Sequence, residues 1–219
     1  MSSMRELSQY NKSLKLLSEI LIDTVQRKEA IDSQLSNELF SLLNDIEESL
    51  GSSSTMPRQL ALNLFRLYVG LTDEFDLLSL EPRELLMIVA RYEDILIRIF
   101  PIKARLYEND DDALNTLDNV TLRVRELELE VVGPARMNKE VNANSISLFK
   151  ELIEEGWNLE RGNDDVSRSF LGAVFNIYDK LKTESYYGTI DTRGMRPLDH
   201  AVLDIRRLMI DMLEDAEEI

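Results

Sequence analysis

Hydrophobic residues recur every three or four positions through the first quarter of the chain, which is the spacing of one face of an α-helix. Lys28 interrupts this stripe, Ile31 and Leu35 continue it, and it then moves to a second row of apolar residues from Leu39 to Leu50. The pattern predicts either one helix of roughly 45 residues or two helices that meet near Lys28. The first row consists of Leu7, Tyr10, Leu14, Leu17 and Leu21.

A helical segment of this length needs a partner along its apolar stripe. We expect the stripe to pack on the protein's own core. The alternative is a homodimer, in which the N-terminal helix packs on a second copy of the chain. Gly51 and the serines that follow it end this segment, and Pro57 can open the next helix.

The rest of the chain also shows helical spacing, so we predict an all-α protein, an irregular multi-helix bundle of about seven helices. Residues 1–50 form the long N-terminal segment and residues 58–219 the bundle, and we expect one continuous domain. No repeat is found at the periods of solenoid proteins. The expected helices after the first segment span residues 58–72, 82–100, 110–132, 144–155, 164–186 and 197–217.

Two further glycines are expected to end helices, and one segment can be interpreted in two ways. Gly156 stands where a glycine stops a helix, with Trp157 folding back on Leu152, and Gly133 with Pro134 stops the helix before it. The end of that earlier helix, Thr121–Val131, alternates apolar and polar residues, so it also fits a strand. We favour helix for it.

The chain has no cysteine, which excludes disulfides, thiolate catalysis and cysteine-ligated zinc. Its N-terminal residues lack the basic and apolar regions of a secretory signal, and its longest apolar run, residues 85–90, is far too short to span a membrane. We therefore expect a soluble intracellular protein, cytoplasmic or nuclear, that has no membrane partner.

The formal net charge of −16 is unevenly distributed, since residues 110–219 hold 24 acidic and 13 basic side chains. Such a field repels nucleic acid and attracts basic partners. The arginines of the second half are isolated, whereas nucleic-acid binding needs a basic stripe. The charge thus predicts a basic protein partner and no nucleic acid.

Asn163, Asp164 and Ser167 precede an apolar helix with the spacing of a carboxylate-and-hydroxyl magnesium motif. The motif needs a further acid one turn later, and Leu171 stands there. A helix cap explains the same residues, because their side-chain oxygens accept the free amide hydrogens of a first turn. We therefore predict that Asp164 caps a helix and that no metal binds.

Glu151, Glu154 and Glu155 resemble half of a helical magnesium cluster, and Asp179 and Glu184 are candidates for the acids that a second helix would have to supply. The alternative interpretation is a magnesium site of carboxylates around Glu151, Glu154 and Asp164. This gives the alternative function, a magnesium-dependent all-α hydrolase of a phosphorylated small molecule. The single histidine, His200, lacks the further imidazoles that helical metal sites use, and no glycine-rich phosphate loop is present. We expect no catalytic residue and no cofactor.

The sequence therefore favours a non-enzymatic interaction protein, an adaptor, scaffold or assembly factor that binds a basic partner through an acidic surface. Its anchors are expected to be two adjacent tyrosines in a loop, because aromatic side chains are common at interfaces. The C-terminal acids are expected to attract the partner. These partner-binding residues are Tyr186, Tyr187, Glu214, Asp215, Glu217 and Glu218.

Overall fold

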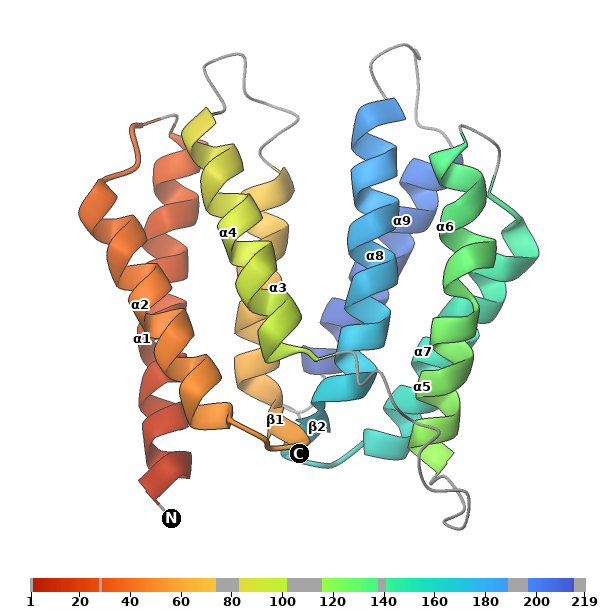
Figure 1. The fold of residues 1–219 in the computed structure, drawn as a ribbon, viewed down its shortest axis with the longest axis horizontal. Coiled ribbons are helices and arrows are strands. Elements are labelled where there is room, and N and C mark those ends of the chain that lie inside the picture. The colour runs from red at the N-terminus through yellow and green to blue at the C-terminus, as the bar shows by residue number, and fades with distance from the viewer. Residues whose placement is uncertain are drawn as a thin grey trace. The chain divides into compact units, whose positions relative to one another are not determined.

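The protein is all-α, as predicted. The computed structural model describes residues 2–27, 29–73, 83–101, 116–137, 141–188 and 197–214. Within these residues the chain forms helices α1 to α9 and two three-residue strands (Figure 1). The described part of the chain has no helix long and apolar enough to cross a membrane.

The described helices fall into two compact units, and the chain passes from one to the other after Phe100. The first unit comprises residues 1–100 together with residues 164–166, and the second comprises residues 101–163 and 167–219. Gly51 and the serines after it therefore lie inside the first unit. Each unit has a hydrophobic core of its own.

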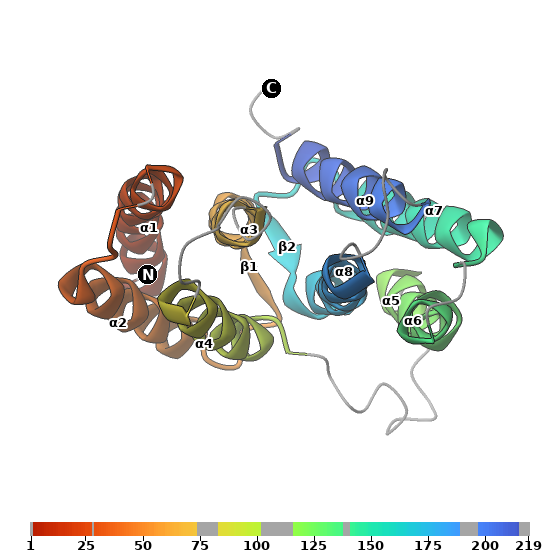
Figure 2. The ribbon, with the colours of Figure 1, turned by 90° about the horizontal axis from the view of Figure 1, so that it is seen from above.

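The first unit is a four-helix bundle. Its helices are α1 (Ser2–Gln26), α2 (Ser33–Leu50), α3 (Arg58–Asp73) and α4 (Arg83–Ile99). Helices α1 and α4 each contact both α2 and α3, so the four form a closed ring around one core, seen end-on in Figure 2. Of the N-terminal leucines, Leu7, Leu14 and Leu21 are buried in this core, as expected for packing on the protein's own chain.

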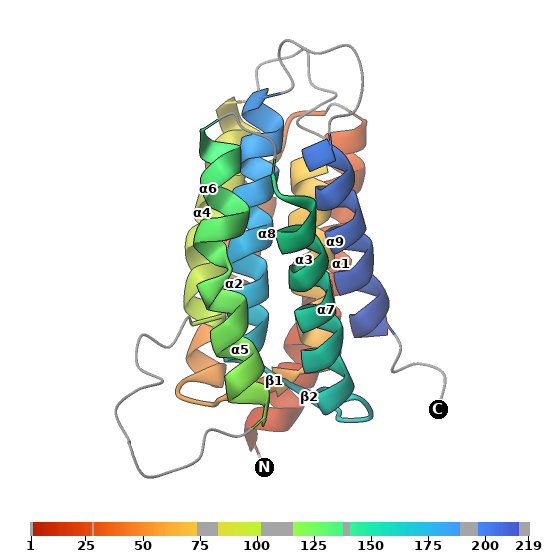
Figure 3. The ribbon, with the colours of Figure 1, turned by 90° about the vertical axis from the view of Figure 1, so that its right-hand side faces the viewer.

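The second unit repeats this arrangement. Its helices are α5 (Thr116–Glu126), α6 (Glu128–Arg136), α7 (Ala143–Glu160), α8 (Arg168–Gly188) and α9 (Pro197–Glu214). Helices α5 and α6 follow one another along the bundle (Figure 3), and their contacts show that together they correspond to α1 of the first unit. Both contact α7 and α8, and α9 closes the ring by contacting α7 and α8 as well.

The two units match residue by residue over most of their length. Helices α2 and α7 have the same length, so matching Ser33 with Ala143 also matches Leu50 with Glu160. The same alignment relates Thr55–Pro57 to Asp165–Ser167 and the first residue of α3 to that of α8. An internal repeat is thus present, and its period is far longer than those of solenoid proteins. Four residues of α3 are identical in α8 in this alignment, namely Arg58, Phe65, Tyr68 and Leu71.

The N-terminal segment is the helix pair, not the single long helix. The side chain of Asp32 accepts the amide hydrogen of Gln34 at 2.9 Å and starts α2. Asn142, the equivalent residue of the second unit, accepts the amide hydrogen of Asn144 at 2.9 Å and starts α7 in the same way. Both side-chain oxygens satisfy an amide that no helical partner can reach.

The two strands were not predicted from the sequence. Strand β1 (Thr55–Pro57) pairs with β2 (Asp165–Ser167), and the amide of Arg58 donates to the carbonyl oxygen of Asp164 at 2.9 Å. Each strand has a buried central residue, Met56 or Val166, and three residues are too few to show an alternating pattern. By contrast, the segment Thr121–Val131 is helical, as favoured, except for a turn at Leu127 between α5 and α6.

Of the three glycines expected to end helices, Gly51 ends α2 as predicted, and the stops expected at Gly133 and Gly156 are wrong. Helix α7 continues through Gly156 to Glu160, and Gly156 faces Phe170 at a distance that leaves no room for a larger side chain. Helix α6 continues through Gly133 and Pro134 to Arg136. Glycine marks a close approach in α7, not a helix end.

Candidate functional site

The acids that suggested a magnesium motif have other roles. Helix α8 begins at Arg168, and Ser167 caps it by accepting the amide hydrogen of Phe170 at 3.3 Å. The predicted cap, Asp164, is therefore wrong, because the helix begins four residues later than expected and Asp164 is exposed before β2. Among the described residues, no group of three or more Asp, Glu or His side chains could hold a metal ion.

A buried carboxylate organises the turn before α8. Glu160 is only 5% exposed, and its Oε1 accepts the amide hydrogen of Ser167 at 2.6 Å. The equivalent residue of the first unit is Leu50, which is equally buried. A carboxyl oxygen at the end of α7 thus accepts a backbone amide hydrogen in the second unit, where the first unit has a hydrocarbon side chain.

The predicted partner-binding residues are placed only in part. Tyr186 and Tyr187 belong to the last turn of α8, so their expected loop position is wrong, because α8 runs to Gly188. Their side chains lie outside the described residues, as do Asp215, Glu217 and Glu218. Glu214 ends α9 and is half-buried. Binding of a basic partner by these residues stays a prediction.

A different acidic surface is fully described on α7. The acidic face of α7 consists of exposed carboxylates between two exposed leucines: Leu148, Glu151, Glu154, Glu155 and Leu159. Leu148 and Leu159 are 38% and 43% exposed. They lie three turns apart, about 16 Å along one side of the helix. Glu155 lies between them on that side and pairs with Arg123 at 3.0 Å.

The two leucines are not needed to build the bundle. At the equivalent positions of α2 the first unit has Glu38 and Ser49, and it forms the same ring of helices with them. An exposed apolar side chain contributes little to the stability of the fold, because it stays in contact with water. The fold therefore does not require leucine at these two positions.

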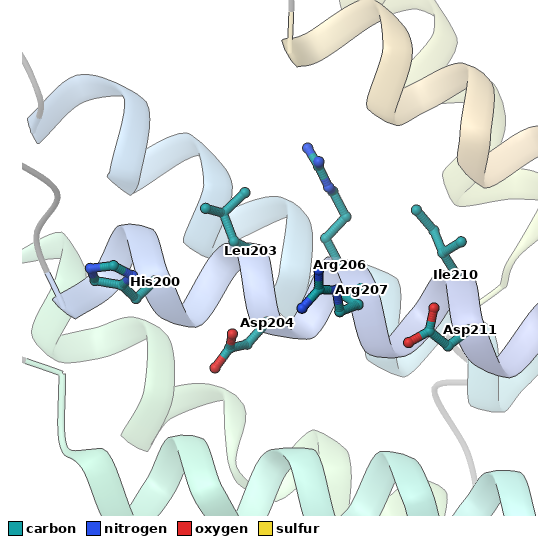
Figure 4. A pocket seen from close by; sticks show the side chains of 7 residues that line it. All are labelled: His200, Leu203, Asp204, Arg206, Arg207, Ile210 and Asp211. Carbon is teal, nitrogen blue, oxygen red and sulfur yellow. The ribbon is translucent and has the colours of Figure 1, made fainter.

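Helix α9 carries the second described surface feature. A groove of about 460 Å³ runs along its outer side and is lined by His200, Leu203, Asp204, Arg206, Arg207, Ile210 and Asp211. Figure 4 shows Asp204 on the other side of the helix from Leu203 and Arg206. Asp204 pairs with Lys150 of α7 at 3.0 Å. The α9 groove thus mixes both charges with two aliphatic side chains.

Sequence reasoning missed the leucines of the acidic face for a specific reason. The helix was expected to stop at Gly156, which placed Leu159 outside it. A helix drawn through Gly156 would have shown Leu148, Glu155 and Leu159 on one side, at the spacing of an exposed amphipathic stripe. The pattern was present, and only the helix end was misplaced.

Comparisons with known protein families, with curated proteins and with solved structures find no match for this chain.

Proposed function

We propose that the protein is an interaction protein that binds a basic, amphipathic segment of a partner protein on the acidic face of α7. The observation that carries this proposal is the exposure of Leu148 and Leu159 where the first unit has Glu38 and Ser49. A surface with apolar anchors among carboxylates suits a segment that has apolar residues flanked by lysine or arginine.

The carboxylates and the leucines of this face contribute to binding in different ways. The carboxylates are exposed, so each contributes little to affinity, but together they raise the rate of encounter with a basic segment. The leucines contribute to affinity when the partner covers them, at about 25 cal/mol for each Å² of apolar surface removed from water. Binding is therefore expected to weaken with salt through its association rate.

The test uses a synthetic helical peptide of lysine and leucine that places its leucines on one side. Fluorescence anisotropy of the labelled peptide measures binding to the whole chain. The variant Leu148→Glu with Leu159→Ser, which copies the first unit, should lose binding. Leu16→Ser removes another exposed leucine, on α1, and should leave binding unchanged.

Two results would contradict the proposal. One is equal binding of a peptide that has the same composition in scrambled order, because the spacing of the leucines would then have no effect. The other is unchanged binding in the double variant.

A further inference from the structure

Helices α4 and α9 occupy the same place in their bundles. Each closes the ring of its own unit, α4 by contacting α2 and α3, and α9 by contacting their equivalents α7 and α8. The outer sides of the two helices are equivalent too, because their buried residues align in one register. In that register Ile88 matches Ala201, Val89 matches Val202, Tyr92 matches Ile205, Leu96 matches Met209 and Ile99 matches Met212.

On these outer sides the charges are reversed. The apolar positions stay apolar, since Ala90 matches Leu203 and Ile97 matches Ile210. The two faces are thus complementary in charge around a shared apolar row. The charged positions change sign at each of four places: Arg91 with Asp204, Glu93 with Arg206, Asp94 with Arg207 and Arg98 with Asp211.

Some of these charged side chains already have a partner within their own bundle. Arg91 lies over the ring of Phe40 at 4.1 Å, and Lys150, the equivalent of Phe40, pairs with Asp204 instead. Arg98 pairs with Glu47 at 2.9 Å. Asp94 and Arg207 are exposed in the middle of their faces, beside Ile97 and Ile210. At that central position the two opposite charges are exposed, so a partner can reach them.

We propose that the outer face of α4 binds the outer face of α9 in a second copy of the chain, with the two helices antiparallel. The contact is centred on Asp94 and Arg207, and the other pairs each lie one helical turn from this centre on both helices. One register therefore pairs opposite charges and apolar residues alike. The pairs are Arg91 with Asp211, Arg98 with Asp204, Ile97 with Leu203 and Ala90 with Ile210.

The exposure of the apolar side chains suits this contact. Ile97 is 57% exposed on α4, and Leu203, opposite it in this register, is 41% exposed in the α9 groove. Covering these side chains removes apolar surface from water, while the charges fix register and direction. Each chain carries both faces, so two copies can close on one another or further copies can add.

The experiment exchanges the central charges. Sedimentation velocity across a wide range of protein concentration should show self-association of the whole chain, weakened by salt. Asp94→Arg gives a chain whose two faces are both positive at the centre, and Arg207→Asp gives one whose faces are both negative. Each variant alone should associate about tenfold more weakly, because like charges then oppose one another.

Mixing the two variants restores opposite charges at the contact between them, and so does the double variant D94R with R207D. Association should return in both cases. Lys15→Asp and Asp45→Arg are matched reversals at exposed positions of α1 and α2 and should have no effect. A monomeric mass of the unaltered chain at all concentrations, failure of the mixture to associate, or equal weakening by the controls would overturn the proposal.

Discussion

Gly156 and Phe170 are in direct contact across α7 and α8: a Cβ atom built on the glycine would lie 2.3 Å from Cζ of the phenylalanine ring. The first unit has Ile46 and Leu60 at these two positions, and all four residues are buried. One unit therefore combines a large residue with a glycine, and the other combines two aliphatic residues of intermediate size. The pairs are alternative ways to fill the same space.

Gly156→Ala is expected to destabilise the protein by about 2 kcal/mol, because the ring cannot move away without disturbing a packed core. Phe170→Leu alone should also destabilise it by leaving a cavity. The double variant should be more stable than the sum of the two changes implies, since the smaller side chain makes room for the methyl group. Urea unfolding followed by the fluorescence of Trp157, which lies beside Gly156, measures all three.

Gly70→Ala is the matched control for this prediction. There the added Cβ would lie 2.5 Å from Cδ1 of Ile22, the end of a flexible side chain. This side chain can change rotamer, so the cost should be smaller than that of Gly156→Ala. Equal costs for the two glycines, or additive effects at Gly156 and Phe170, would refute the packing argument.

Tyr92 gives a prediction for alkaline pH. Its hydroxyl donates to the carbonyl oxygen of Leu64 at 2.7 Å, and burial raises the pKa of this tyrosine well above its usual range. In the unfolded chain the phenol ionises with a pKa of about 10, whereas in the folded chain it stays protonated at that pH. Tyr92 therefore stabilises the fold fully below that pH and progressively less above it.

Tyr92→Phe should lower the free energy of unfolding by about 1 kcal/mol at neutral pH, through loss of the hydrogen bond. The difference between the two proteins should shrink as the pH rises above about 10, because only the tyrosine loses stability by ionising. Urea unfolding at several alkaline pH values measures this difference. A difference that stays constant with pH would contradict the assignment.

Glu160 should be needed for the turn before α8. Replacing it by leucine, the residue of the first unit, removes the acceptor for the amide of Ser167 and should cost about 1–3 kcal/mol. Glu160→Gln keeps an acceptor oxygen and should cost less. Thermal unfolding followed by circular dichroism compares the two variants, and equal losses would contradict the role given to this hydrogen bond.

The two helix caps should contribute equally to their units. Asp32→Ala and Asn142→Ala should each lower stability by about 1 kcal/mol, since each leaves an amide of a first turn without its side-chain acceptor. Asp45→Ala, at an exposed position within α2, is the control and should change stability little. Chemical unfolding followed by circular dichroism tests the three variants, and a control as costly as the caps would refute the argument.

The sequence predicted the fold class and most helices because apolar residues recur at helical spacing throughout. It did not predict the division into two bundles. The repeat has few identical residues, and its period, which is about half of the chain, exceeds those of solenoids. The sequence did contain signs of the repeat. An arginine begins both apolar helices, Arg58 and Arg168, and a tyrosine stands ten residues later in each, Tyr68 and Tyr178.

The candidate surfaces were less predictable for a physical reason. Whether a leucine is buried or exposed depends on which helices surround it, and the spacing of apolar residues along one helix cannot decide this for a wide stripe. Leu148 and the fully buried Phe149 are adjacent in the sequence, and it is the neighbouring helices that leave one exposed and bury the other. Likewise, the complementary charges of α4 and α9 become visible only when the two bundles are compared position by position.

Strand β2 has a consequence for the order in which the protein is made. Residues 164–166 belong to the first bundle, yet the ribosome adds them only after it has made α5, α6 and α7. At about 5–20 residues per second, the nascent chain spends several seconds with all the helices of that bundle synthesised and its edge strand missing. During this interval Thr55–Pro57 has no neighbouring strand from its own chain.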